Sequence, residues 1–91
     1  MQNGKPVPDP NAYPCTVYVK VMGRKSLRFE ALIQALVAQH VRPEALLAVS
    51  RRDSRESHYS SLTFTIRAQS RAQLDALYQS LKGCPEVLLA L

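Results

Sequence analysis

The sequence is poor in the residues that build disulfide scaffolds, metal clusters and membrane spans. Two cysteines, Cys15 and Cys84, are too few for a disulfide framework or a cysteine-rich metal site, and both are predicted to be free thiols. No apolar run approaches the roughly 20 residues that a membrane span needs. The opening residues lack the charged and then apolar pattern of a secretory signal. We therefore expect a cytoplasmic protein without a membrane partner.

Glycine and aromatic residues are also scarce, which bears on two kinds of binding site. The chain has three glycines and no tryptophan, and aromatic residues make up 7% of it. The basic turn after the first apolar segment carries only Gly23, whereas a backbone cradle for phosphate usually needs several glycines. The formal charge of +5 is an excess that serves solubility as readily as it serves a nucleic-acid partner.

Prolines mark where the folded part begins. Pro6, Pro8, Pro10 and Pro14 leave no apolar periodicity before Tyr13. Residues 1–12 are therefore expected to form a disordered tail. Residues 13–91 have room for one small core, which predicts a single domain.

Four segments have the character of strands. The alternation of apolar and polar residues is clearest in residues 15–22, which Gly23 ends, and in residues 58–68. The buried positions are predicted to be Cys15, Val17, Val19 and Val21 in the first of these, and Leu62, Phe64, Ile66 and Ala68 in the second. Residues 46–53 and 87–91 are predicted to be shorter strands. The polar run SRRDSRES, residues 50–57, is predicted to form a turn.

Two amphipathic helices separate these strands. Ser26 can cap the first helix, which should end before Pro43 because a residue preceding proline is disfavoured in the helical region. Its apolar face is predicted to be Phe29, Ile33, Leu36, Val37 and His40. In the second helix, Ser70 and Gln73 have the spacing of a capping box, and Gly83 supplies the stop.

This order of elements predicts an α+β, ferredoxin-like βαββαβ sandwich. Its four-stranded antiparallel sheet has the order 4-1-3-2, and both helices pack on one face. The first and third strands lie at the centre, which agrees with their clear alternation. Residues 46–53 and 87–91 then form the two edges.

Several short stretches resemble the YbeD-like family of small bacterial proteins of unknown function. They are YPC at residues 13–15, KVMG at residues 20–23, and the pattern YxSxT at Tyr59, Ser61 and Thr63. The resemblance implies a ferredoxin-like fold similar to that of ACT regulatory domains, and it brings no catalytic residue, cofactor or established partner. The chain departs from the family at Tyr18, where a proline is expected, and in its arginine-rich hairpin.

The predicted topology gathers basic residues at one rim of the sheet, because the first strand ends beside the start of the third. The residues of this basic rim are Arg24, Lys25, Arg51, Arg52, Arg55 and His58. The amino end of the first helix lies there too and adds a partial positive charge. An anion or an acidic partner is one hypothesis for the rim. A solvated, charged hairpin is the other, since Asp53 and Glu56 interrupt the arginines.

The open face of the sheet is the second candidate surface. It is predicted to present Tyr18, Lys20, Thr63 and Thr65, a mixed set suited to contact with a partner. RNA-recognition domains share this topology but carry two or three aromatic residues on that face, where this chain offers Tyr18.

An enzyme is not favoured. Acylphosphatases share the fold, but they use an asparagine that this chain has only at Asn3 and Asn11, in the expected tail. The sequence therefore favours a non-enzymatic regulatory module without a cofactor or metal, monomeric or weakly dimeric, that binds an unknown protein or small effector. Nucleic-acid or anion binding through the basic rim is the alternative.

Overall fold

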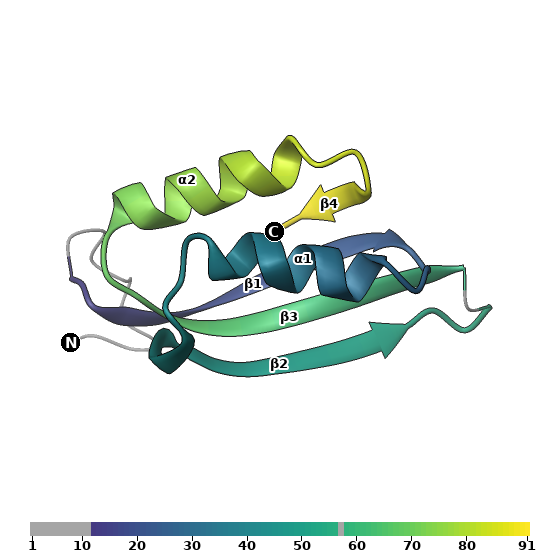
Figure 1. The fold of residues 1–91 in the computed structure, drawn as a ribbon. Coiled ribbons are helices and arrows are strands. Elements are labelled where there is room, and N and C mark those ends of the chain that lie inside the picture. Colours follow the sequence, from purple (N-terminus) through teal and green to yellow (C-terminus); the bar gives the residue numbers. More distant parts are fainter. Residues whose placement is uncertain (1–11, 57) are drawn as a thin grey trace, which may run out of the picture.

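The strands and helices follow one another in the predicted order (Figure 1). The computed structural model describes residues 12–56 and 58–91, so the expected tail lies outside the described residues except for Ala12. The elements are β1 (Cys15–Arg24), α1 (Phe29–Ala38), β2 (Leu46–Asp53), β3 (Tyr59–Ala68), α2 (Arg71–Lys82) and β4 (Val87–Ala90). A single 3-10 turn, Pro43–Ala45, leads into β2.

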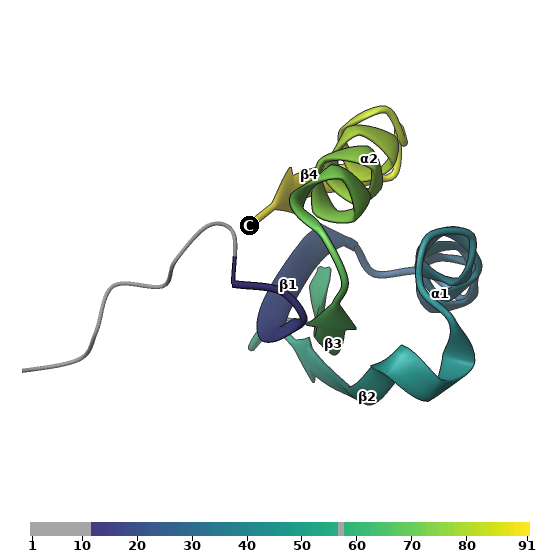
Figure 2. The same ribbon diagram turned by 90° about the vertical axis from the view of Figure 1, so that its left-hand side faces the viewer.

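The four strands form an antiparallel sheet in the order β2-β3-β1-β4. This is the predicted order 4-1-3-2 counted from the other edge, so the predicted ferredoxin-like fold is confirmed. β1 and β3 pair along their whole length, from Cys15 opposite Ala68 to Arg24 opposite Tyr59. Figure 2 shows α1 and α2 on the same side of the sheet, which leaves its other face uncovered by either helix.

The core lies between the sheet and the two helices. The fully buried side chains of the strands are Val19, Val21, Leu62, Phe64, Ile66 and Ala68, and those of the helices are Phe29, Ile33, Val37, Leu77 and Leu81. The strand positions and the three of α1 are among those that alternation and helical spacing predicted. Four further predicted positions, Cys15, Val17, Leu36 and His40, are only partly buried. No helix in the described part of the chain is long and apolar enough to cross a membrane.

A serine side chain accepts an amide hydrogen bond at the start of each helix. Ser70 is the N-cap of α2, as predicted, whereas the N-cap of α1 is Arg28, two residues after the predicted Ser26, and its side chain makes no capping bond. The Phe29 amide donates to Ser26 Oγ at 3.0 Å, and the Gln73 amide donates to Ser70 Oγ at 3.1 Å. The reciprocal bond at α2 differs from an ordinary capping box, because Gln73 Oε1 accepts from the amide of Gln69, one residue before the cap, at 2.7 Å. Past the end of α1, His40 Nε2 lies 2.9 Å from Ser80 Oγ and so joins the two helices.

The predicted strand over residues 46–53 is confirmed as β2, whose pairing with β3 continues to Asp53 opposite Ser60. The overlapping turn predicted over residues 50–57 began too early, because residues 50–53 belong to this strand. They look like a turn in the sequence because β2 is an edge strand and its residues here are solvated. β1 also runs past Gly23 to Arg24, since Arg24 still pairs with Tyr59.

Candidate functional site: the basic rim and the open face of the sheet

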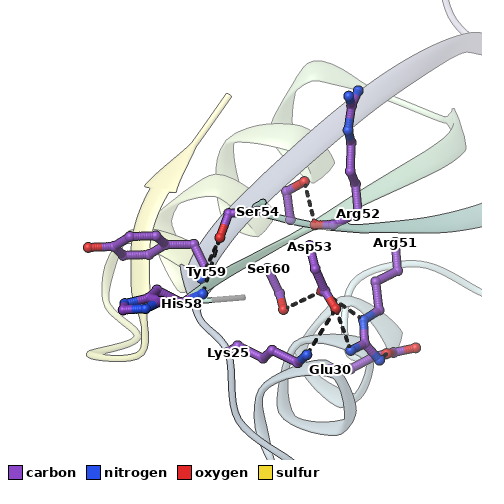
Figure 3. Close-up of polar contacts among 10 residues, drawn as sticks. Lys25, Glu30, Arg51, Arg52, Asp53, Ser54, His58, Tyr59 and Ser60 are labelled. Carbon is purple, nitrogen blue, oxygen red and sulfur yellow. Dashed lines mark hydrogen bonds and ion pairs between the residues drawn. The ribbon is translucent and has the colours of Figure 1, made fainter. Parts of the chain in front are cut away.

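The predicted site residues lie on two opposite faces of the sheet. Arg51 is opposite Leu62, a core residue, and therefore faces the helices. Arg52 is opposite Ser61, which itself pairs with Met22, and it faces the open side. Figure 3 shows the two arginine side chains pointing in opposite directions. The basic rim is therefore divided between two surfaces.

On the helix side, the rim is organised around Asp53. Its Oδ2 accepts from Arg51 at 3.0 Å and lies 3.3 Å from Lys25 Nζ, and its Oδ1 accepts from Ser60 Oγ at 2.8 Å. Arg51 also reaches Glu30 on α1 at 3.2 Å (Figure 3). This cluster links the β2–β3 hairpin to the start of α1.

The contacts within this cluster favour the ionised forms of Asp53 and Arg51. The Arg51 guanidinium and the Ser60 hydroxyl, together with Lys25, hold the pKa of the Asp53 carboxyl well below its usual range. The hydrogen bond to Asp53 raises the pKa of Arg51. Two carboxylates therefore balance Lys25 and Arg51, which weakens the positive field expected of the rim.

The remaining residues of the predicted rim, Arg24, Arg55 and His58, lie outside the Asp53 cluster. Arg24 lines a shallow hollow with Ser26, Glu86 and Leu88, and Arg55 is exposed in the hairpin turn. The His58 backbone closes the rim, since its carbonyl accepts from the Lys25 amide at 3.0 Å. Among the described residues, neither Arg24 nor Arg55 takes part in an ion pair.

The turn after β1 is a strand-to-helix corner. A Cβ on Gly23 would lie 2.7 Å from Phe29 Cζ and 2.5 Å from the Glu86 carbonyl oxygen, so this glycine allows the Phe29 ring to pack closely. The Phe29 amide already donates to Ser26. Gly23 therefore serves packing and offers no cradle for a ligand.

The open face contains a hollow of about 210 Å³. Its lining includes Lys20, Met22, Arg52, Ser54, Tyr59 and Ser61, and we call it the open-face hollow. Tyr18, Thr63 and Thr65 lie on the same face, and Tyr18 is 69% exposed. Lys20 and Arg52 were each predicted as site residues, but on different surfaces, and the structure brings them to one hollow.

Met22, Ser54 and Tyr59 were not predicted as members of a site. The register sets Met22 in one row with Ser61 and Arg52 across three strands, and Ser54 and Tyr59 flank the turn between β2 and β3. Alternation along the predicted strand 46–53 would have placed Arg52 on the open side, but Arg52 was also counted in the predicted turn and was assigned to the basic rim.

Other reactive groups are dispersed. Cys15 and Cys84 are free thiols, as predicted. The described residues contain no group of three or more His, Cys, Asp or Glu side chains that could hold a metal ion.

Comparison with known proteins points to one family. The sequence profile of a family described as "Protein of unknown function (DUF493)" matches residues 9–91. A UPF0250 protein of Bordetella parapertussis is 39% identical over 79 residues, which cover 87% of each chain. A UPF0250 protein of Nitrosomonas europaea is 38% identical over 79 residues, 87% of this chain and 91% of the relative.

Solved structures with a similar fold are more distant in sequence. Protein HP0495 of H. pylori has a TM-score of 0.70 at 15% identity, with 99% of this chain and 98% of that chain covered. The ACT domain from GTP pyrophosphokinase of Chlorobium tepidum has a TM-score of 0.68 at 9% identity, with 85% and 83% covered. At these identities the similarity shows the fold alone.

Proposed function

The chain belongs to the DUF493 family of proteins of unknown function, and we propose that it is a non-enzymatic module that binds a small effector through the open face of its sheet. Membership confirms the resemblance to the YbeD-like family, because the curated relatives are UPF0250 proteins. The ACT-like fold supports a regulatory role, since the similar ACT domain is part of a larger enzyme, a GTP pyrophosphokinase.

The observation that carries the proposal is the chemistry of the open-face hollow. Lys20 and Arg52 line it together with hydroxyl-bearing residues, and neither cation takes part in an ion pair among the described residues. Exposed cations beside an aromatic ring and polar side chains provide both charge and specific hydrogen bonds for a small ligand. On the helix side, by contrast, Lys25 and Arg51 are already balanced by acidic side chains.

A catalytic role has no comparable support. The serine–histidine contact between Ser80 and His40 joins two helices, and no carboxylate among the described residues is hydrogen-bonded to His40 to orient it as a base. At the β1–α1 corner, the Phe29 amide donates to Ser26 Oγ, so this amide is already engaged and does not point to a substrate oxygen.

Chemical-shift mapping tests the proposal. The isotope-labelled full chain is titrated with separate pools of nucleotides, amino acids and acidic metabolites. We expect one pool to shift the amides of Tyr18, Lys20, Thr63 and Thr65 saturably while those of α1 and α2 stay in place. If no pool moves these amides, or if the shifts gather at Arg24, Lys25 and Arg55, the proposal is wrong and a rim-binding function replaces it.

Two matched variants separate the faces. Thr63→Glu adds a negative charge to the open face, whereas Gln79→Glu adds the same charge to the exposed side of α2. We expect the first to weaken binding of an acidic effector at least about fivefold through like-charge repulsion and the second to leave it unchanged. Equal effects of both variants would contradict an open-face site.

A further inference from the structure

We propose that the open-face hollow binds the phosphate group of a small phosphate monoester. The inference rests on the proposed function, since it names the class of effector that the open face receives. The charges, the free donors and the apolar wall of the hollow support it.

Lys20 and Arg52 bring two positive charges to the hollow from different strands. The described residues form four ion pairs, and neither side chain takes part in any of them. Arg52 lies in one row with Ser61 and Met22 across β2, β3 and β1. Lys20 lies opposite Thr63, which is two residues from Ser61 and on the same face. The arginine fork can hold two oxygens of one anion, and the lysine adds a point charge.

Asp53 also lines the hollow, but its carboxylate is engaged elsewhere. Its Oδ2 contacts Lys25 and Arg51, and its Oδ1 accepts from Arg51 and Ser60. The two carboxylates of that cluster balance its two cations. The charges of Lys20 and Arg52 are therefore left for a ligand.

Neutral donors complete the site. Ser54 Oγ accepts from the amides of His58 and Tyr59, both at 3.2 Å, so its own hydroxyl proton remains to be donated. Tyr59 is 41% exposed beside it, and its phenol can donate as well. Met22 and the Tyr59 ring supply apolar surface for the organic part of the ligand.

This set of groups distinguishes a phosphate monoester from other anions. A monoester carries about −1.5 to −2 charges at pH 7 and three acceptor oxygens, which correspond to two cations and at least two neutral donors. A carboxylate has one charge and two oxygens. A nucleic-acid backbone has one charge per phosphate and gains its affinity from many phosphates in a row, which one hollow cannot provide.

The test compares matched probes on the isotope-labelled full chain at fixed ionic strength and pH 7.5. Phenyl phosphate, inorganic phosphate and benzoate are titrated separately, and the amides of Lys20, Arg52, Tyr59 and Ser61 are followed. We expect phenyl phosphate to shift these amides saturably and to bind at least about tenfold more tightly than benzoate, because charge-assisted hydrogen bonds are the strong ones. Inorganic phosphate should compete with phenyl phosphate.

Variants assign the effect to the two cations. Lys20→Gln and Arg52→Gln should each weaken phenyl phosphate binding about tenfold, the loss expected for one charge-assisted hydrogen bond. Arg67→Gln removes the same charge from the far end of the same face, where Arg67 pairs with Thr16, and should change the affinity less than twofold. Unchanged amide dispersion shows that each variant is folded.

The outcomes separate this inference from the proposed function. If phenyl phosphate leaves the hollow unmoved while another pool still shifts the open face, the phosphate inference is overturned and the effector function stands. If neither moves this face, both are overturned. If Arg67→Gln weakens binding as much as Arg52→Gln does, binding follows diffuse charge and the inference is again overturned.

Discussion

At the scale of single residues, Gly23 shows how packing can account for a glycine that looks functional in the sequence. In the sequence it lies between an apolar strand and a helix, beside the basic residues Arg24 and Lys25, as phosphate-binding glycines do. In the structure it is buried, and the ring of Phe29 and the carbonyl of Glu86 occupy the space that a side chain would need. Its role is to let β1, α1 and the chain before β4 approach one another.

Replacing Gly23 with alanine should therefore destabilise the fold. The Glu86 carbonyl is backbone and cannot move without disturbing β4, so we expect a loss of about 1–3 kcal/mol in the free energy of unfolding, as for other overpacked cores. Urea denaturation monitored by circular dichroism measures it.

Gly83→Ala is the matched control, because a Cβ there meets its nearest atom, the Gln79 carbonyl oxygen, at 3.4 Å. Its φ of −80° suits any residue, so we expect a change within about 0.5 kcal/mol. Equal stability of the two variants would show that Gly23 is not held by packing.

Asp53 is the second residue with a testable environment. Its pKa in the folded state lies below the ordinary value of 3.8, so its contribution to stability is complete above the unfolded-state pKa and is lost as the pH falls towards the folded-state pKa. Asp53→Asn should flatten the decrease in the free energy of unfolding between about pH 5 and pH 2.

Carbon-detected NMR of the Asp53 carboxyl gives a direct measure of its pKa. We expect a midpoint below 3.8 in the parent protein and a higher midpoint in Arg51→Gln, which loses the principal hydrogen-bond donor. A midpoint at or above 3.8 in the parent protein would mean that the Asp53 cluster does not persist in solution.

At the scale of elements, the cap of α2 and the strand over residues 46–53 were predictable, whereas the start of the turn after β2 and the end of β1 were not. Ser70 stands three residues before Gln73, a purely local pattern, and its bond is observed at 3.1 Å. The start of the turn after β2 depends on pairing with β3, a long-range feature. Residues 50–53 are polar because this edge strand is solvated, so the same residues fitted both the predicted strand over 46–53 and the predicted turn over 50–57.

The cap of α2 offers a prediction at this scale. Ser70→Ala removes the acceptor of the Gln73 amide and should cost about 1 kcal/mol of stability, while Ser70→Asp retains an acceptor and should cost much less. Thermal unfolding of the two variants compares them directly. If alanine and aspartate behave alike, the bond seen at Ser70 contributes nothing measurable.

The difference between local sequence patterns and long-range pairing also explains how much of the candidate site could be predicted. The alternation of β1 and β3 correctly placed Tyr18, Lys20, Thr63 and Thr65 on one face. The basic rim was assembled from closeness in topology alone, so Arg51 and Arg52 were grouped although the register directs them to opposite faces. The ion pairs of Arg51 were not predictable, because they depend on where α1 lies above the sheet.

At the scale of the whole molecule, the positive charge is less available than its formal value of +5 suggests. The predicted rim contains five lysine or arginine residues: Arg24, Lys25, Arg51, Arg52 and Arg55. Lys25 and Arg51 are balanced by Asp53 and Glu30, and Arg52 faces the other side of the sheet. A nucleic-acid strand that follows the rim therefore meets Arg24 and Arg55 as the two rim cations that form no ion pair within residues 12–56 and 58–91.

The salt dependence of oligonucleotide binding measures how many rim cations contact phosphates. For single strands, the logarithm of affinity falls with the logarithm of salt concentration with a slope of about 0.7 per phosphate contact. Two contacts therefore predict that affinity for an oligonucleotide falls about sevenfold between 50 and 200 mM salt, and five contacts predict a fall of about 130-fold. We expect the shallow dependence. Asp53→Asn should release Lys25 for phosphate, while Arg51 keeps its ion pair with Glu30, and should steepen the fall towards about 20-fold, the value for three contacts. A steep dependence already present in the parent protein would mean that the Asp53 cluster opens to admit nucleic acid.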